Sequence, residues 1–314
     1  MIVFKIKYAA NYLLALWFKY SHCTYIRTIF IEVTSRCNLS CQNCYRTGID
    51  YKSKNKDMSL VNFKRAIDSI PVKVNTLIPQ GLGESTINPD LLKMIRYAYD
   101  SHKFKNIFFN TNLLFGETEQ FDMYFDNGLS GIWVSVDSFK QETLDALKSG
   151  TNAEILHNKL VEAVKRYRNK IFVRIVVSKT NLQDFEKTLS EIIQIGVKTI
   201  DVQNLIDFKD RHIAISGRDV KHVNKIIRKH KRKAKINYSE AANICTQPFD
   251  TIAINVNGMV EPCCIWFNEE IINFGHIEEG FLNTYHSRKF KNIRAEFYVK
   301  KPFFCVGCPK YKYL

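Results

Sequence analysis

Glycine and proline are scarce in this chain of 314 residues, which contains 13 Gly and 7 Pro. Their scarcity excludes collagen-like and proline-rich proteins. Long apolar runs are also missing: the uncharged run Tyr8 to Phe18 is shorter than the roughly 20 residues that cross a bilayer. With 46% hydrophobic and 25% charged residues, the composition indicates a packed globular protein. The length predicts one large α/β domain with a small appendage.

Acidic residues are in deficit. The chain has 46 Lys and Arg against 31 Asp and Glu, a net charge of +15. This excess predicts an anionic partner, and the composition leaves open a phosphorylated substrate, a nucleic acid or a membrane surface. Residues 211–235 alone carry ten Lys or Arg. A solvated basic helix is the simplest interpretation of this segment, and a polyanion site is the alternative.

Cysteine is absent between Cys44 and Cys245, although the chain holds nine cysteines. A secreted disulfide scaffold would be small, dense in cysteine and preceded by a cleavable signal, and no small-residue cleavage site follows the apolar N-terminus. We therefore expect a cytoplasmic protein with reduced thiols that can bind metal. Residues 5–20 predict a helix that is apolar over most of its circumference, docked on the domain or held peripherally at a membrane surface.

Six apolar runs rich in β-branched and aromatic residues alternate with amphipathic stretches. Nearly continuous apolar strands between two-faced helices predict a parallel sheet covered by helices, either doubly wound or curved into a barrel. The expected strands are 29–34, 73–79, 105–109, 131–136, 171–177 and 198–204. The expected helices between them include 58–70, 89–101, 153–169 and 182–195.

The pattern changes near residue 240, where we expect a domain boundary. Asn257-Gly258, between the apolar runs 252–256 and 259–263, predicts a hairpin with a two-residue turn. A helix is expected over about 280–297. The predicted organisation is an N-terminal helix in 1–28, a core domain and a C-terminal domain. The two domains span 29–240 and 241–314.

Cys37, Cys41 and Cys44 form a C-x3-C-x2-C loop directly after the first expected strand. Three thiolates on one short loop can bind three corners of a cubane iron–sulfur cluster. A closed structural zinc site requires four ligands, and no fourth Cys or His lies nearby in the sequence. Three ligands leave one iron open, at the strand end where α/β folds place reactive groups.

This loop, followed by Tyr45, resembles the signature of radical S-adenosylmethionine (SAM) enzymes. Gly81-Leu82-Gly83-Glu84 after the second strand is similar to the glycine–glutamate motif of that family, with Ser85 where proline is usual. The resemblance implies a partial (β/α)6 TIM-like barrel, open on one side, that binds SAM and a [4Fe–4S] cluster. It implies a cofactor-binding set of Tyr45, Gly83, Glu84, Asn112, Ser135, Asp137, Lys148 and Arg174. Arg174 is also a candidate substrate contact, with Gln203 and Asn204.

A second group of cysteines lies in the C-terminal segment: Cys245, Cys263, Cys305 and Cys308. Their number and spacing suit zinc or a second [4Fe–4S] cluster. The arrangement resembles the SPASM/twitch extensions of radical SAM enzymes, which implies an auxiliary [4Fe–4S] cluster on these four ligands. Cys264 and Cys23 are left over. The simple interpretation is a buried thiol, and the alternative makes Cys264 a catalytic hydrogen-atom donor.

The resemblance implies reductive cleavage of SAM to a 5′-deoxyadenosyl radical that abstracts a hydrogen atom from a substrate, with an electron donor such as flavodoxin or ferredoxin. An auxiliary cluster would favour oxidation of the substrate, and a Cys264 donor would favour epimerisation. Only 36 residues precede Cys37, which leaves no room for an N-terminal peptide-recognition domain. This favours a small-molecule substrate, anionic or sugar-like. The alternatives are a maturase that modifies a peptide or protein and, more distantly, a zinc-stabilised nucleic-acid-binding protein.

Overall fold

A computed structural model gives the structure of most of the chain. Residues 5–20, Cys23, Cys245 and Cys308 lie outside its described part. The described residues are 26–47, 50–207, 212–238, 247–265, 269–270, 272–299 and 302–305.

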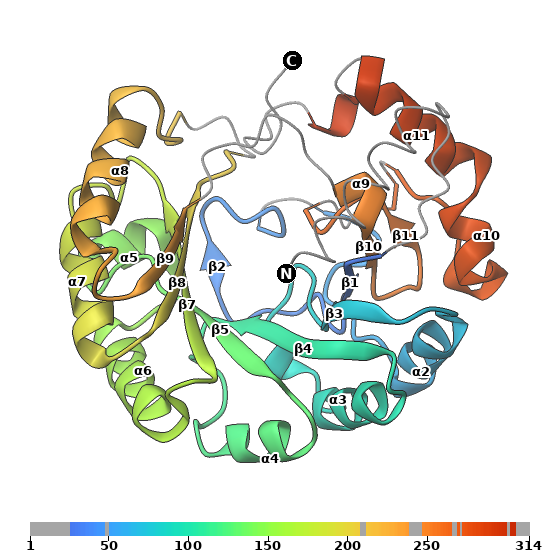
Figure 1. Cartoon of the computed structure of the whole chain (residues 1–314), viewed down its shortest axis with the longest axis horizontal. Coiled ribbons are helices and arrows are strands. Elements are labelled where there is room, and N and C mark those ends of the chain that lie inside the picture. Colours follow the sequence, from blue (N-terminus) through green and yellow to red (C-terminus); the bar gives the residue numbers. More distant parts are fainter. Residues whose placement is uncertain are drawn as a thin grey trace.

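The core of the protein is a curved sheet in which six strands follow one another in space in chain order and run parallel (Figure 1). The expected partial (β/α)6 barrel is therefore confirmed, and each expected strand is present within a few residues. The strands are β1 (Thr28–Ile31), β3 (Val74–Ile78), β4 (Phe104–Thr111), β5 (Gly131–Ser135), β7 (Ile171–Val177) and β8 (Thr199–Asn204).

Helices cover the convex side of this sheet (Figure 1). Single residues fix several helix ends. The Ser59 side chain caps the amino end of α2 and the Asn152 side chain caps the amino end of α6, while Gly196 adopts a left-handed conformation at the carboxyl end of α7. Two short helices, α4 and α5, were not predicted. The helices are α2 (Leu60–Ser69), α3 (Leu91–Asp100), α4 (Gln120–Asp126), α5 (Gln141–Leu147), α6 (Ala153–Tyr167), α7 (Phe185–Ile195) and α8 (Arg218–His230).

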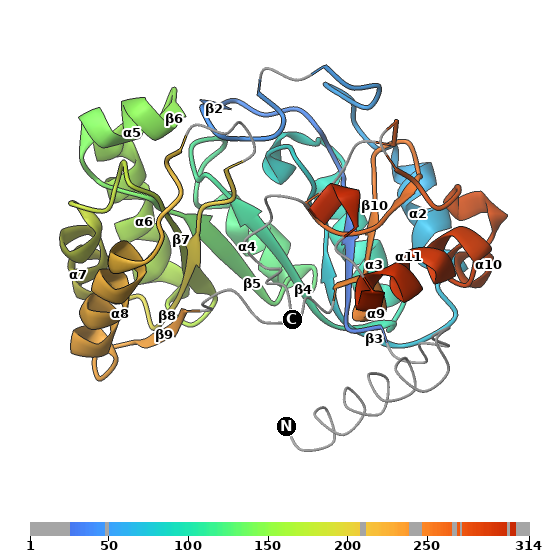
Figure 2. The same ribbon diagram turned by 90° about the horizontal axis from the view of Figure 1, so that it is seen from above.

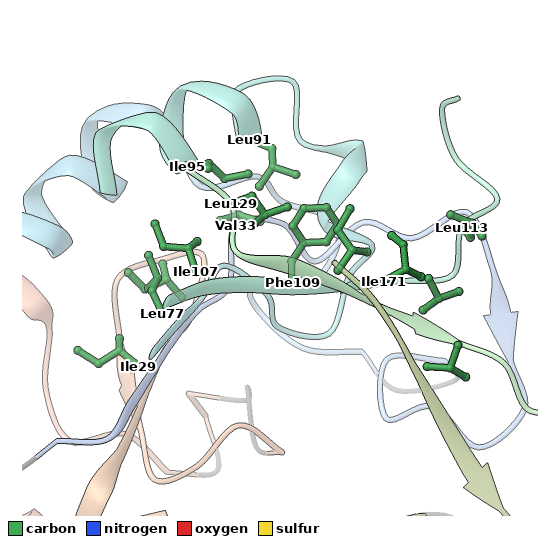
Figure 3. Close-up of a cluster of buried hydrophobic side chains, with 14 of the residues drawn as sticks. Ile29, Val33, Leu77, Leu91, Ile95, Ile107, Phe109, Leu113, Leu129 and Ile171 are labelled. Carbon is green, nitrogen blue, oxygen red and sulfur yellow. The ribbon is translucent and has the colours of Figure 1, made fainter. Parts of the chain in front are cut away.

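The hydrophobic core lies between the sheet and these helices. Ile29, Leu77, Ile107 and Phe109 are buried strand residues that share one cluster with helical residues such as Ile95 (Figure 3). Because side chains alternate along a strand, the residues between them point to the concave side. On β4, β5, β7 and β8 these alternate positions are only half-buried, and they form the inner face of the barrel.

Two further parallel strands extend the sheet at its ends. β9 (Lys235–Tyr238) pairs with β8, and β10 (Thr251–Ile254) pairs with β1. The solvated basic helix expected in 211–235 is present as α8, whose Lys and Arg side chains are exposed, but it ends at His230 and the chain then turns back into β9. The expected hairpin is confirmed by β11 (Val260–Glu261), antiparallel to β10, but the expected two-residue turn is wrong: the Asn255 amide donates to the Met259 carbonyl, and the three residues 256–258 form the turn.

The C-terminal segment shares the barrel sheet through β10. The expected boundary at 240 falls outside the described residues, so it stays a prediction. The expected helix over 280–297 is wrong in one respect: it is two helices, because the chain breaks at His286 and Ser287. Helices α9 (Gln247–Asp250), α10 (Phe281–Tyr285) and α11 (Arg288–Val299) pack here. None of the helices in the described ranges is long and apolar enough to cross a membrane.

Arg294 holds these three helices together. Its side chain is 1% exposed, and it donates to the carbonyl oxygens of Pro248 at 2.7 Å and Tyr285 at 2.8 Å. Its guanidinium also lies 4.0 Å from the ring centre of Tyr285 and 3.8 Å from that of Phe290. Cation–π contacts strengthen when they are shielded from water.

We predict that Arg294→Met lowers the free energy of unfolding by about 3 kcal/mol, because two buried carbonyl oxygens lose their donor. Urea unfolding of the two proteins measures the difference. The matched control is Arg96→Met, which removes an exposed arginine that is paired, among the described residues, only with Asp100 and should cost less than about 1 kcal/mol. Equal losses in the two variants would contradict the role given to Arg294.

Candidate functional site

The cysteine loop is fixed against the segment that follows α5. Cys41 pairs with Lys148 and Ser40 with Ser149 in a small antiparallel sheet of β2 (Ser40–Cys41) and β6 (Lys148–Ser149). The Gln42 amide also donates to the Leu147 carbonyl at 3.0 Å. Figure 2 shows β2 and β6 at the same end of the barrel, at the top of the view. The loop is therefore held at the carboxyl ends of the barrel strands.

Cys37, Cys41 and Cys44 are free and half-buried. Burial raises the pKa of the Cys41 thiol to about 12 and also raises the pKa of the Cys37 thiol, and the neighbouring loop thiols raise these two pKa values further. Thiolates at these positions would therefore need a cationic partner such as iron. The described residues contain no group of three or more His, Cys, Asp or Glu set around a single metal ion. A cubane cluster instead binds one thiolate at each separate corner, and the donor set fits it.

Two glycines allow the chain after β3 to lie directly against the chain after β1. A Cβ on Gly83 would be 2.3 Å from the carbonyl oxygen of Thr34 and 2.5 Å from that of Arg36. A Cβ on Gly81 would be 2.3 Å from Cγ of Glu32. Only glycine permits this approach, because the atoms opposite Gly83 belong to the backbone that leads into the cysteine loop.

Glu32 joins three segments at this point. It is fully buried, and its carboxylate accepts from the amides of Leu82 at 2.9 Å and Val256 at 3.2 Å. Burial raises the pKa of Glu32 to about 8, although these two hydrogen bonds act in the opposite direction, and the neighbouring Glu269 raises it further. One side chain thus connects β1, the glycine–glutamate segment and the hairpin that follows β10.

Glu84 is 4% exposed and lies beside the cysteine loop. Its amide donates to the Arg36 carbonyl at 2.8 Å, and its carboxylate accepts from the Asn112 amide and the Thr86 hydroxyl, both at 2.8 Å. Burial raises the pKa of Glu84. The Asn112 side chain donates to Asn38 Oδ1 at 2.8 Å, inside the cysteine loop. Glu84 and Asn112, expected in the cofactor-binding set, are therefore brought together with the thiols.

Asp137 and Lys148 form an ion pair of 2.9 Å between Oδ2 and Nζ. The side chains are 9% and 14% exposed, and the other Asp137 oxygen accepts from the Val176 amide at 2.8 Å. Lys148 Nζ also donates to the Ser135 carbonyl at 3.3 Å. Lys148 is paired with Cys41 in β6, so this group of expected residues also lies next to the thiols.

Arg174 lies further along the inner face. Its Nε is 3.0 Å from Asp201 Oδ2, its Nη1 donates to Asn110 Oδ1 at 3.2 Å, and its guanidinium lies 5.1 Å from the Trp133 ring centre. Gln203 donates to the same Asp201 oxygen at 2.6 Å. Trp133 and Asp201 were not among the expected site residues. The signal that could have found them is a polar or Trp residue at alternate positions of otherwise apolar strands.

Other expected residues lie elsewhere. Tyr45 is 5% exposed and its ring centre is 6.4 Å from that of Tyr51. Cys263 and Cys305 are buried, whereas their expected partner ligands lie outside the described residues. Cys264 is half-buried, with its sulfur 3.4 Å from the amide nitrogen of Gln247.

Comparison with known families decides what this arrangement is. The sequence matches the family described as "Radical SAM superfamily" over residues 31–192, and the iron–sulfur cluster-binding SPASM domain over 245–309. The chain belongs to the radical SAM superfamily. Membership implies a [4Fe–4S] cluster that binds SAM, SAM itself and an auxiliary cluster in the SPASM domain.

Relatives and solved structures agree with this membership. The chain is 26% identical over 190 residues to the tungsten-containing aldehyde ferredoxin oxidoreductase cofactor-modifying protein of Pyrococcus furiosus, across 58% of this chain and 52% of that protein. The match thus spans about half the length of that relative. One similar structure is anSMEcpe with AdoMet and the Cp18Cys peptide, which has a TM-score of 0.70 and 14% sequence identity and covers 90% of this chain and 85% of that one. Another is BtrN with AdoMet and 2-DOIA, which has a TM-score of 0.57 and 14% sequence identity and covers 87% of each chain. At these identities the structures show the shared fold.

We predict that Gly83→Ala displaces the cysteine loop, because its methyl group would meet two backbone carbonyl oxygens. After anaerobic reconstitution, the iron bound by this variant should fall by up to half, with loss of the SAM-binding cluster. The control is Gly217→Ala, which strains the backbone at a φ of +48° but places its Cβ with no atom within 4 Å, so it separates general backbone strain from the clash at Gly83. Full iron content in the Gly83 variant would show that the close approach is dispensable.

We further predict a pH dependence from Glu32. Its folded-state pKa of about 8 lies above the ordinary value of 4.5, so its contribution to stability is fully present below pH 4.5 and is lost as the pH rises through 8. Between pH 5 and 8, the free energy of unfolding should therefore fall by about 2–4 kcal/mol more in the native chain than in Glu32→Gln. Urea titrations at each pH test this, with exposed Glu154→Gln as control. Parallel pH curves for the native chain and Glu32→Gln would contradict it.

Proposed function

We propose that this radical SAM enzyme oxidises a small, polar, sugar-like substrate held against the inner face of the barrel. The observation that carries the proposal is the row formed by Asn110, Arg174, Asp201 and Gln203, beside Trp133 and below the cysteine loop. When bound, the cluster and SAM together supply a 5′-deoxyadenosyl radical that removes a hydrogen atom from the substrate. The chain itself supplies binding, orientation and shielding.

Cys37, Cys41 and Cys44 are the proposed ligands of the SAM-binding cluster. Glu84 and Asn112 are proposed to orient the amino-acid end of SAM, a role supported by the hydrogen bonds that join them to each other and to Asn38 in the loop. Charge-assisted hydrogen bonds to such groups contribute roughly 1.5–3 kcal/mol. The expected cofactor-binding roles of Gly83, Ser135, Asp137 and Lys148 rest on their packing around the same loop. The expected cofactor-binding role of Tyr45 stays a prediction.

The charges on the inner wall favour a neutral or zwitterionic substrate over a strong anion. Arg174 is paired with Asp201, and Lys148 with Asp137, so each cation already has its counter-ion. Such paired groups still donate to and accept from hydroxyl and amino groups. Trp133 lies 5.0 Å from Phe172 between ring centres and offers an apolar surface to a sugar ring.

Oxidation is preferred to epimerisation because an electron acceptor is implied by the SPASM domain. Cys263 and Cys305, with Cys245 and Cys308, are the proposed ligands of the auxiliary cluster. The substrate radical would lose one electron to the auxiliary cluster and a proton to solvent. Together with the hydrogen atom already removed, this makes a net two-electron oxidation. Cys264 contacts Gln247 and is proposed to remain a structural thiol. A low-potential protein such as flavodoxin or ferredoxin is the proposed reductant.

Modification of a peptide is the second candidate. It is supported by anSMEcpe, whose structure contains a peptide and which shares the fold over 90% of this chain. A peptide can also bind the inner wall, because backbone amides donate and accept in the same way as hydroxyl groups.

We predict that the anaerobically reconstituted chain binds about eight irons as two [4Fe–4S] clusters. Changing Cys37, Cys41 and Cys44 together to Ala should halve the iron and abolish formation of 5′-deoxyadenosine. The control changes Cys264 to Ala and should retain both clusters. Stoichiometric zinc without the brown iron–sulfur absorption would contradict the assignment.

The substrate class and the outcome can be tested together. Turnover in D2O with a low-mass polar metabolite fraction should stimulate formation of 5′-deoxyadenosine and yield an oxidised product without solvent deuterium on the reacting carbon. Cys264→Ala should retain most activity. Stimulation by a peptide fraction alone would favour the second candidate. Deuterium at an inverted carbon, lost in Cys264→Ala, would establish epimerisation, because a thiol exchanges its proton with solvent.

A further inference from the structure

The connections at the end of the barrel opposite the cysteine loop are basic, although Asp68, Asp100 and Asp126 lie in the last turns of the helices that precede them. Six connections lead from a helix into the next strand of the main sheet, and all lie at this amino-terminal edge because the strands are parallel. Together they carry eight Lys or Arg and no Asp or Glu. The connections are 70–73, 101–103, 127–130, 168–170, 196–198 and 231–234. Their basic residues are Lys73, Lys103, Arg168, Lys170, Lys198, Lys231, Arg232 and Lys233.

The opposite edge, which holds the candidate active site, does not share this bias. The described parts of the loops that follow β1, β3, β4, β5, β7 and β8 carry seven Lys or Arg and ten Asp or Glu. A substrate bound at the active site therefore does not explain the basic edge. Figure 2 shows the separation, with β2 and β6 at the top of the view and β9 near the bottom.

Helix dipoles account for part of the bias, since the carboxyl ends of helices favour cations in the adjoining turn. Lys103 has such a role, because its Nζ donates to the carbonyl oxygens of Ile67 at 2.8 Å and Asp68 at 3.0 Å. Lys170 lies over the Phe125 ring at 4.4 Å. The other six basic residues form no ion pair or side-chain hydrogen bond within the described residues. Three consecutive cations at Lys231–Lys233, all exposed, exceed what one helix end requires.

The N-terminal segment of the chain joins the barrel at this same edge. β1 begins at Thr28, so Ile26 and Arg27 precede the sheet on the basic side. The sequence before them, 5–20, is predominantly apolar, with Trp17 and three lysines. Lipid surfaces are bound by apolar side chains combined with cations, whereas nucleic acids require cations alone or with exposed aromatic rings.

We propose that the amino-terminal edge of the sheet docks on a bilayer surface that contains anionic lipids, with the candidate active site facing away from the membrane. Each Lys or Arg near such a surface strengthens binding about fivefold, and salt weakens the attraction. The proposal is independent of the proposed substrate.

Sedimentation of the full chain with vesicles tests the proposal. The vesicles are phosphatidylcholine alone, or phosphatidylcholine with about 30% phosphatidylserine, in about 0.1 M salt. The test variant is Lys231→Gln/Arg232→Gln/Lys233→Gln. The matched control, Lys56→Gln/Lys140→Gln/Lys179→Gln, removes the same charge from exposed lysines at the opposite edge. Equal iron content in all three proteins verifies folding.

The native chain and the control should bind the anionic vesicles, and the test variant, which lacks three cations, should bind them about a hundredfold more weakly. Equal weakening of vesicle binding in both variants would overturn the proposal, because it would show that binding depends on the net charge of the chain and not on the basic edge. Equal binding of the native chain to both vesicle types would assign attachment to the apolar segment without the basic edge. No binding to either, or displacement from anionic vesicles by a single-stranded RNA probe, would also overturn it.

Discussion

The close approach between two strand ends is the constraint on which the rest of the site depends. The chain after β3 lies against the chain after β1 with no room for a Cβ at Gly81 or Gly83. This contact fixes the backbone from which the cysteine loop departs, and it brings Glu84 within hydrogen-bond distance of Arg36. A side chain at either glycine would move the thiols relative to the rest of the barrel.

The parallel sheet turns this local contact into a binding surface. Residues at successive inward positions of β4, β5, β7 and β8 are brought into register, so Asn110, Arg174 and Asp201 meet although they are far apart in the chain. Buried charges are costly unless they are paired, and Lys148 beside the thiols and Arg174 on the inner wall each have an anionic partner. The result is a polar wall without a strong net charge, which suits a substrate bound by many hydrogen bonds.

Much of this arrangement could be predicted from the sequence. The six strands were found because their apolar runs are uninterrupted, and the cysteine loop because its spacing is distinctive. The α4 and α5 helices were missed because seven residues are too few for a clear 3.6-residue period. The expected helix at 280–297 is divided because Ser287 caps a new helix by accepting from the Phe290 amide.

Side-chain partners that are distant in the sequence could not be predicted, for a physical reason. The pairing of Arg174 with Asp201, and the joining of Glu32 to Val256, depend on strand order and register rather than on neighbouring residues. Sequence patterns report which face a residue occupies, but register decides which residues meet across strands. The expected cofactor-binding residues were found because the family motif follows the strand ends, which is a resemblance and not a calculation of contacts.

The contact between Glu32 and Val256 joins residues that are 224 positions apart. On a ribosome that adds about 5–20 residues per second, Glu32 would wait roughly 10–45 seconds for its partner. During that time β1 has a neighbour on one side only, because β10 has not yet been made. A nascent chain would thus expose both an open strand edge and three reactive thiols. Cellular factors that shield nascent chains and deliver iron–sulfur clusters would therefore act while the strand edge and the three thiols are still exposed.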